Sequence, residues 1–158
     1  MHACRALQRR RQTADALASG LAVAVLLLFM TACSEPFVVL PGGQLPGKVA
    51  APPALWGDVP ETIDIESRPD DPYSVIVWAV GLGPDLYVAT SGEGTNWTRH
   101  FDANPLMRAR IDSTLYELSA VKIGDPTEMA RVIAAYEAKY DTEPAAFSSG
   151  MIYRLDRR

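Results

Sequence analysis

Hydrophobic and polar residues alternate in short stretches of the chain beyond residue 61, with turn residues between these stretches. Residues 62–67 place an apolar side chain at every second position, which is typical of a strand with one face in water. Residues 73–80 are apolar at nearly every position, which predicts a strand covered on both faces. The turn residues predict the remaining strands: 86–90 after a loop at 81–85, a hairpin of 106–111 and 114–123, and a last strand within 147–155.

Two segments between these strands have the pattern of helices. The first begins at Thr95 or Asn96, keeps Trp97 and Phe101 on one face, and ends before Pro105. The second begins at the capping sequence 125–128, Asp-Pro-Thr-Glu, and its apolar stripe comprises Met129, Val132, Ile133, Tyr136 and Tyr140. One amphipathic and one short helix among five or six strands predict an α+β, mainly β domain, a small β-barrel with the longer helix outside.

The first 33 residues have the organisation of an export signal. Arginines at 5 and 9–11 precede an apolar run over 14–30, and Met30-Thr31-Ala32 stand directly before Cys33. This order resembles the lipobox of bacterial lipoproteins, which implies a signal peptide over 1–32 and a lipid attached to Cys33. Ser34, rather than Asp, follows the cysteine, and the resemblance then implies an outer-membrane protein facing the periplasm. The alternative is a retained transmembrane helix, for which the apolar run is short compared with about 20 residues.

Removal of residues 1–32 changes the chemistry of the chain. Cys4 leaves with the signal and Cys33 carries lipid, which excludes a cysteine nucleophile, a zinc–thiolate site and a disulfide scaffold. From Ser34 onward, 11 Lys and Arg face 18 Asp and Glu, a formal net charge of −7 against −4 for the whole chain. Such an acidic domain is not expected to bind nucleic acid or anionic headgroups, so the expected membrane contact is the lipid anchor. His100 stands alone after processing, and no metal site is expected.

Residues 33–61 separate the signal from the domain predicted over 62–158. Their many prolines and glycines exclude a regular helix or a central strand, and two interpretations remain. The segment is either a tether or a wrap that lies on the domain. Its apolar residues favour the wrap, with Trp56 as one anchor.

The stretch 86–111 carries a second resemblance. It contains a strand, the glycines Gly92 and Gly94, Trp97 at a helix start, Ala103-Asn104-Pro105, and then a strand with Arg108 and Arg110. This order resembles the split β-barrel superfamily of pyridoxamine-phosphate oxidases and deazaflavin-dependent nitroreductases. The resemblance implies a split barrel, a homodimer, and a flavin or deazaflavin held in a groove at the dimer interface.

The same resemblance implies which residues would hold the cofactor: Thr90, Ser91, Gly94, Thr95, Asn96, Trp97 and Arg99. Backbone N–H groups at glycines and at a helix start favour a phosphate, and Arg99 would add a charge-assisted contact. Each position also has a structural interpretation, with Arg99 paired to Asp102, Trp97 in the core, and Arg108 and Arg110 on the wet face of a strand.

Two functions follow from these residues. Glu93 adds a negative charge to the loop and residues 73–80 carry no cation, which favours a binding or interaction domain with a degenerate cofactor groove. Its ligand would then be a small molecule or another protein. The alternative is a flavin- or deazaflavin-dependent oxidoreductase, and a third interpretation is a structural envelope protein with no ligand.

Overall fold

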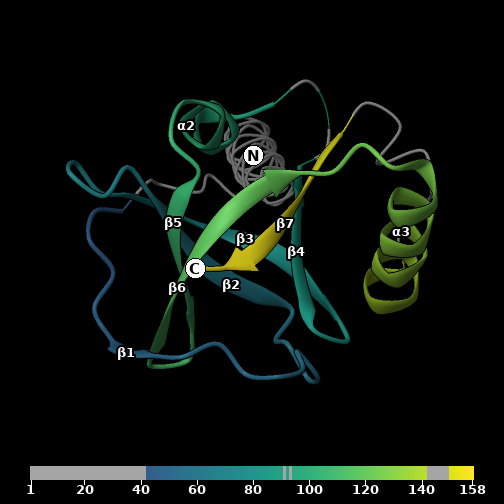
Figure 1. Ribbon diagram of the computed structural model, residues 1–158, viewed down its shortest axis with the longest axis horizontal. Helices are drawn as coiled ribbons and strands as arrows, with labels where there is room; N and C mark the ends of the chain where they lie inside the picture. Colours follow the sequence, from purple (N-terminus) through teal and green to yellow (C-terminus); the bar gives the residue numbers. More distant parts are fainter. Residues whose placement is uncertain (1–41, 91, 93, 142–149) are drawn as a thin grey trace, which may run out of the picture. The chain divides into compact units, whose positions relative to one another are not determined.

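The computed structural model describes residues 42–90, 92, 94–141 and 150–158 (Figure 1). The predicted signal peptide, Cys33, Ser91 and Glu93 lie outside these described residues. The strands and helices, in chain order, are β1 Lys48–Ala50, β2 Thr62–Ser67, β3 Tyr73–Leu82, β4 Asp85–Thr90, α2 Asn96–Ala103, β5 Leu106–Ile111, β6 Thr114–Lys122, α3 Pro126–Tyr140 and β7 Met151–Arg157.

Six of the strands close into a barrel. The neighbours follow the order β6-β5-β2-β3-β4-β7, and a pairing of β7 with β6 completes the ring. The strand β1 adds to β6 in parallel, outside the closed ring. The predicted α+β, mainly β class and the barrel are therefore confirmed, and Figure 1 shows α3 outside the strands on the side of β4.

The barrel interior is a hydrophobic core that α2 closes at one end. Alternate residues of each strand point inward, among them Ile63 and Ile65 of β2 and Met107 and Ala109 of β5. From α2, Trp97 and Phe101 pack edge-on against Tyr153 of β7, with ring centroids 5.5 to 5.8 Å apart. The other members of this core are Trp56, Val75, Val77, Ala79, Leu86, Val88, Leu118, Ala120 and Leu155.

A second hydrophobic cluster lies outside the barrel, beneath α3. It contains Val80 of β3, Tyr87 of β4, Ile123, Ile152 of β7, and Val132 and Tyr136 of α3. Val132 and Tyr136 are fully buried, whereas Ile133 is only half-buried at the edge of the cluster. The fully buried part of the predicted apolar stripe is therefore narrower than the sequence suggests. The reason is that α3 rests on the outside of a sheet that is already closed, so only one narrow face of the helix is covered.

The outer face of β3 is covered over only part of its length. Ile76 and Trp78 are 54% and 47% exposed, so the prediction of a strand covered on both faces was wrong at these positions. The register of β3 against β4 runs from Ala79 to Leu82, and α3 covers Val80. The first half of β3 is not covered by α3.

Polar groups of α3 also reach the backbone of β3. The Tyr136 hydroxyl lies 3.1 Å from the carbonyl oxygen of Trp78 and 3.2 Å from that of Tyr87. The Tyr140 hydroxyl accepts a hydrogen bond from the Ala79 N–H at 3.0 Å and lies 2.8 Å from the Ala79 carbonyl oxygen. Lys139 Nζ donates to the carbonyl oxygens of Val59, Pro60 and Ala79 at 2.7 to 2.8 Å. Side chains of α3 therefore hold both β3 and the loop before β2.

The described part of the segment 33–61 lies on the barrel. Trp56 is 4% exposed, packs edge-on against Tyr116, and donates its backbone N–H to the carbonyl oxygen of Gly83. Gly81 allows this close approach, because a Cβ atom there would overlap the backbone of Trp56. Gly42 forms an antiparallel bridge with Ser74 at the start of β3. Trp56 is therefore an anchor, as its sequence context predicts.

We expect Val132→Glu to lower the free energy of unfolding by about 3 kcal/mol or more, because it places a charge in the cluster beneath α3. The matched control is Ala134→Glu on the exposed face of the same helix, where a change within about 0.5 kcal/mol is expected. Urea unfolding followed by circular dichroism measures both. Equal unfolding midpoints for the two variants would contradict the assignment of Val132 to the cluster.

Candidate functional site

The residues predicted to hold a cofactor lie along the connection from β4 to α2. Thr90 ends β4 and is 8% exposed, while Thr95 is the N-cap of α2. Gly94 has a φ of 113°, a left-handed conformation that favours glycine, and a Cβ there would meet Thr98 Oγ1 at 3.0 Å. Asn96 and Arg99 are exposed on the first turns of α2. The structure thus brings these residues to one end of the barrel.

Several of these side chains already have partners within the domain. Trp97 is 6% exposed in the core, which agrees with its structural interpretation and leaves no open ring face. Arg99 Nη2 donates to Asn96 Oδ1. The alternative pairing of Arg99 with Asp102 is not seen, since Asp102 Oδ1 accepts a hydrogen bond from the Tyr153 hydroxyl at 3.1 Å. Among the described residues of this connection, Arg99 is the one cation whose side chain is exposed to solvent.

The start of α2 has one group without a partner. The Thr95 N–H donates to Thr98 Oγ1 at 2.9 Å, and Thr98 Oγ1 donates to the Thr95 carbonyl oxygen at 2.9 Å. The Thr95 hydroxyl is buried and forms no hydrogen bond within the described residues. A buried polar group without a partner is costly, so this hydroxyl is a candidate contact for a ligand.

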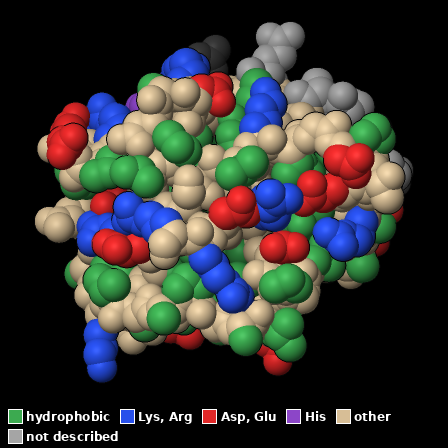
Figure 2. Space-filling model, viewed as in Figure 1, with side chains coloured by type: hydrophobic (Ala, Val, Ile, Leu, Met, Phe, Trp, Pro, Cys, Tyr) green, Lys and Arg blue, Asp and Glu red, His purple; other side chains and the backbone are tan. Residues whose placement is uncertain are grey.

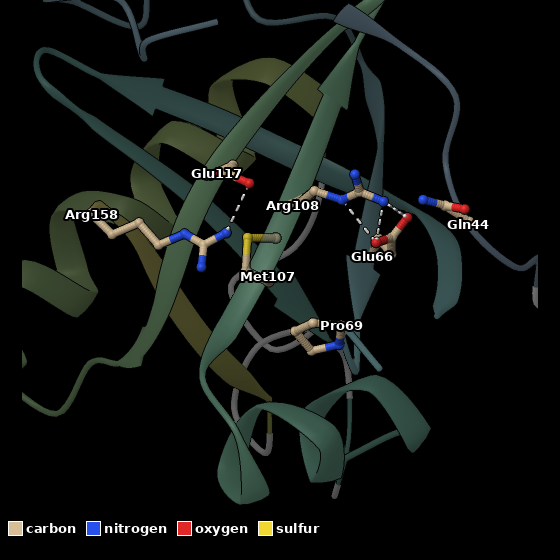
Figure 3. A pocket seen from close by; sticks show the side chains of 7 residues that line it. All are labelled: Gln44, Glu66, Pro69, Met107, Arg108, Glu117 and Arg158. Carbon is tan, nitrogen blue, oxygen red and sulfur yellow. Dashed lines mark hydrogen bonds and ion pairs between the residues drawn. The ribbon is translucent and has the colours of Figure 1, made fainter. Parts of the chain in front are cut away.

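A hollow of about 190 Å³ lies elsewhere, on the outer faces of β2, β5 and β6 (Figure 3). Figure 3 shows two ion pairs across it, Arg108 with Glu66 and Arg158 with Glu117. Glu66 is 3% exposed, receives both Nε and Nη2 of Arg108 at 2.6 to 2.9 Å, and accepts the Leu45 N–H. Arg108 and Glu66 thus form a two-pronged, charge-assisted pair, in which the guanidinium group is engaged by the carboxylate beside it.

The strand β5 therefore does not present the simple wet face expected from its alternating arginines. Arg108 is paired with the buried Glu66, and Arg110 pairs with Asp64 at 2.8 Å. Both contacts cross the β2–β5 register directly, Arg108 opposite Glu66 and Arg110 opposite Asp64. The predicted place of these arginines on the outer face is confirmed, since both are partly exposed. Their pairing with carboxylates of β2 was not predicted, because it depends on the neighbouring strand.

A second hollow, of about 400 Å³, lies at the N-terminus of α3, and its lining includes both carboxylates and arginines. The Tyr87 hydroxyl donates to Glu128 Oε1 at 2.9 Å, and Arg154 Nη1 donates to the same oxygen at 2.8 Å. Burial, and then the hydrogen bond to Glu128, raise the pKa of Tyr87 to about 12. Arg154 also pairs with Asp156 at 2.6 Å. Tyr87 is therefore a neutral hydroxyl that organises this corner of the barrel.

Most of the described arginines on the barrel are paired with carboxylates. Figure 2 shows Lys and Arg side chains beside Asp and Glu side chains, with no patch of one sign on the face that it presents. Five described arginines pair with carboxylates, namely Arg68, Arg108, Arg110, Arg154 and Arg158. A flavin phosphate needs cations that are free to meet it, so the described residues of one chain supply only part of such a site.

One contact between α2 and β2 has no signal in the sequence. Ser67 Oγ and His100 Nδ1 lie 3.0 Å apart, and the Tyr73 ring packs edge-on against His100 at 4.8 Å. Burial lowers the pKa of His100, and the positive charges of Arg68 and Arg99 lower it further. Ser67 is only 2% exposed, so this pair fastens α2 to the barrel and is closed to a substrate. Only the fold places these residues together, since 33 positions separate them.

No described helix is long and apolar enough to cross a membrane. No group of three or more His, Cys, Asp or Glu side chains suited to a metal occurs among the described residues.

We expect the protein to lose stability as the pH falls below about 6.5, the ordinary pKa of histidine. The folded-state pKa of His100 is lowered, so its contribution is present above the unfolded pKa and is lost as the pH falls through the folded pKa. Urea midpoints at pH 7 and pH 5, compared between wild type and His100→Gln, isolate this contribution. An identical pH dependence in both proteins would contradict it.

Comparison with known proteins gives one result, and it concerns the fold. No protein-family model matches the chain, and no curated protein sequence matches it. Among solved structures, HutZ of Vibrio cholerae, described as a heme storage protein, aligns with a TM-score of 0.51 at 14% identity, covering 62% of this chain and 82% of HutZ.

Two further structures are similar. A protein of unknown function from Agrobacterium tumefaciens has a TM-score of 0.51 at 19% identity, covering 60% of this chain and 47% of that protein. A Listeria innocua protein assigned as a pyridoxamine 5'-phosphate oxidase has a TM-score of 0.48 at 18% identity, covering 60% and 82%. The likenesses to HutZ and to the Agrobacterium tumefaciens protein concern the fold alone, and they agree with the closed six-stranded barrel described above.

Proposed function

We propose that this chain is a bacterial envelope lipoprotein whose split barrel serves as a binding or interaction domain. In this proposal the signal is removed, Cys33 carries lipid, and the barrel stands at the outer membrane facing the periplasm. The sequence Met30-Thr31-Ala32-Cys33 after an apolar run supports the anchor, and Ser34 supports the outer membrane. The predicted net charge of −7 for the processed chain agrees with attachment to the membrane through a lipid rather than through basic residues.

The observation that carries the binding-domain part is the pairing of the barrel's arginines. Where a cofactor phosphate would lie, Arg99 is the one exposed cation among the described residues, and it is bonded to Asn96. The guanidinium groups of Arg108 and Arg110 on β5 are held by carboxylates of β2. With these cations engaged, the described residues offer little positive charge to a dianionic phosphate.

The second candidate function is a flavin- or deazaflavin-dependent oxidoreductase. It is favoured by the buried Thr95 hydroxyl, which forms no hydrogen bond within the described residues and lies at a helix start. A bound phosphate would accept a hydrogen bond from this hydroxyl, and Arg99 would add a charge. The flavin would supply the redox chemistry, while a second copy of the chain would form the other wall of the groove in a homodimer.

We expect Cys33→Ala to abolish lipid attachment, because the thiol of Cys33 is the only group that the lipobox offers for acylation. Cells grown with a labelled fatty acid measure this directly, with Cys4→Ala as the matched control that keeps its label. Equal label in wild type and Cys33→Ala would rule out the anchor.

We expect purified protein to show no flavin absorbance and to leave the fluorescence of added flavin or deazaflavin unchanged up to millimolar concentration. The oxidoreductase alternative predicts quenching instead, and a loss of about 1.5–3 kcal/mol of binding free energy in Arg99→Ala, the range for a hydrogen bond to a charged group. Quenching that Arg99→Ala weakens in this way would establish the cofactor site and displace the binding-domain proposal.

A further inference from the structure

An apolar ridge lies on the outer face of β3 and consists of Ile76 and Trp78. These side chains are 54% and 47% exposed, whereas the other two tryptophans, Trp56 and Trp97, are 4% and 6% exposed. Side chains two residues apart on a strand share a face, so Ile76 and Trp78 form one continuous surface. Neighbouring large apolar side chains in water mark a site of contact with a protein or a membrane.

Trp78 is held in place rather than loosely exposed. Its ring stacks on Tyr140, with centroids 4.7 Å apart and planes 12° from parallel, and Tyr140 stacks on Tyr136 at 5.6 Å. The Tyr140 hydroxyl is bound to both backbone groups of Ala79, and Tyr136 is fully buried. A rotamer fixed in this way loses little entropy when a partner covers it.

The ridge stands close to the point where the chain leaves the described domain. Gly42 bridges Ser74, with backbone N–H to oxygen distances of 2.8 and 2.9 Å. Ser74 lies on the same face as the ridge and precedes Trp78 by four residues, about 13 Å along a strand. Cys33 is nine residues before Gly42, and a chain of this length spans at most roughly 30 Å.

The charges beside the ridge are balanced. Asp64 is the cross-strand neighbour of Ile76, and it pairs with Arg110 at 2.8 Å. Thr62, an uncharged residue, lies opposite Trp78. A neutral surface with an exposed tryptophan suits the headgroup level of a bilayer, where the apolar ring and its N–H group are both satisfied.

We infer that the ridge of Ile76 and Trp78 docks on the lipid surface to which the chain is tethered, with Trp78 at the headgroup level. This inference rests on the proposed anchor at Cys33, because a tether of roughly 30 Å holds the ridge near the bilayer. A contact of the ridge with the bilayer, in addition to the lipid on Cys33, fixes which side of the barrel faces the periplasm.

Tryptophan emission of the full chain in vesicles tests the docking. The vesicles contain zwitterionic phosphatidylcholine, either plain or with bromine on the acyl carbons next to the headgroup. Because Trp56 and Trp97 are buried, quenching by bromine reports on Trp78. We expect brominated vesicles to quench the wild type, Trp78→Phe to lose this quenching, and Ile76→Ser to reduce it.

The matched control is Val121→Ser on β6, which stands opposite β3 in the six-stranded ring. Val121 is 39% exposed, and its neighbour Ala120 points into the core, so this change removes an apolar side chain from the far wall. We expect it to leave the quenching unchanged. Equal emission in plain and brominated vesicles, or equal quenching in wild type and Trp78→Phe, would overturn the inference.

Two further outcomes are informative. A blue shift of the emission that depends on protein concentration without vesicles would assign the ridge to a second copy of the chain and overturn the lipid contact. Fatty-acid labelling of the same samples separates the two proposals. Label without bromine quenching leaves the anchor standing and removes the docking, whereas quenching without label supports the docking and contradicts the anchor at Cys33.

Discussion

The hydrogen bonds from α3 to the backbone of β3 are the contacts on which this domain depends. Hydroxyl groups of Tyr136 and Tyr140 and the ammonium group of Lys139 reach carbonyl or N–H groups of Trp78, Ala79 and the loop before β2. Backbone polar groups removed from water must be paired, and here side chains of α3 pair with some of the backbone groups of β3 and of the loop before β2. This requirement fixes the position of α3. The position of α3 in turn determines which part of β3 stays in contact with solvent.

The surface chemistry follows from the same arrangement. Beneath α3, Tyr87 and Glu128 form a neutral corner with Arg154, while on the opposite side of the ring β2 and β5 pair their carboxylates with Arg108 and Arg110. With these cations engaged, the domain offers little to a free phosphate. The engagement of these cations is why we favour binding over redox chemistry. The apolar ridge of Ile76 and Trp78 lies where α3 leaves β3 uncovered.

Local patterns were sufficient to predict most of the fold. The capping aspartate of α3 and the alternation in β2 act within a few residues, and both elements begin where the sequence indicates. Burial of Ile76, Trp78 and Ile133 could not be predicted, since it depends on how far one helix reaches across a closed sheet. The pairs Arg108–Glu66 and Ser67–His100 could not be predicted either. Their members are 42 and 33 positions apart in the chain, and only the folded barrel brings them together.

The exchange rate of the Ala79 amide hydrogen tests the role of α3 most directly. This N–H donates to the Tyr140 hydroxyl at 3.0 Å, a contact that Tyr140→Phe removes while keeping the ring. The account predicts that Ala79 exchanges several-fold to about tenfold faster in the variant, as expected for a bond of about 0.5–1.5 kcal/mol, while amides of β5 keep their rates. Unchanged exchange at Ala79 would contradict the claim that α3 completes the pairing of β3.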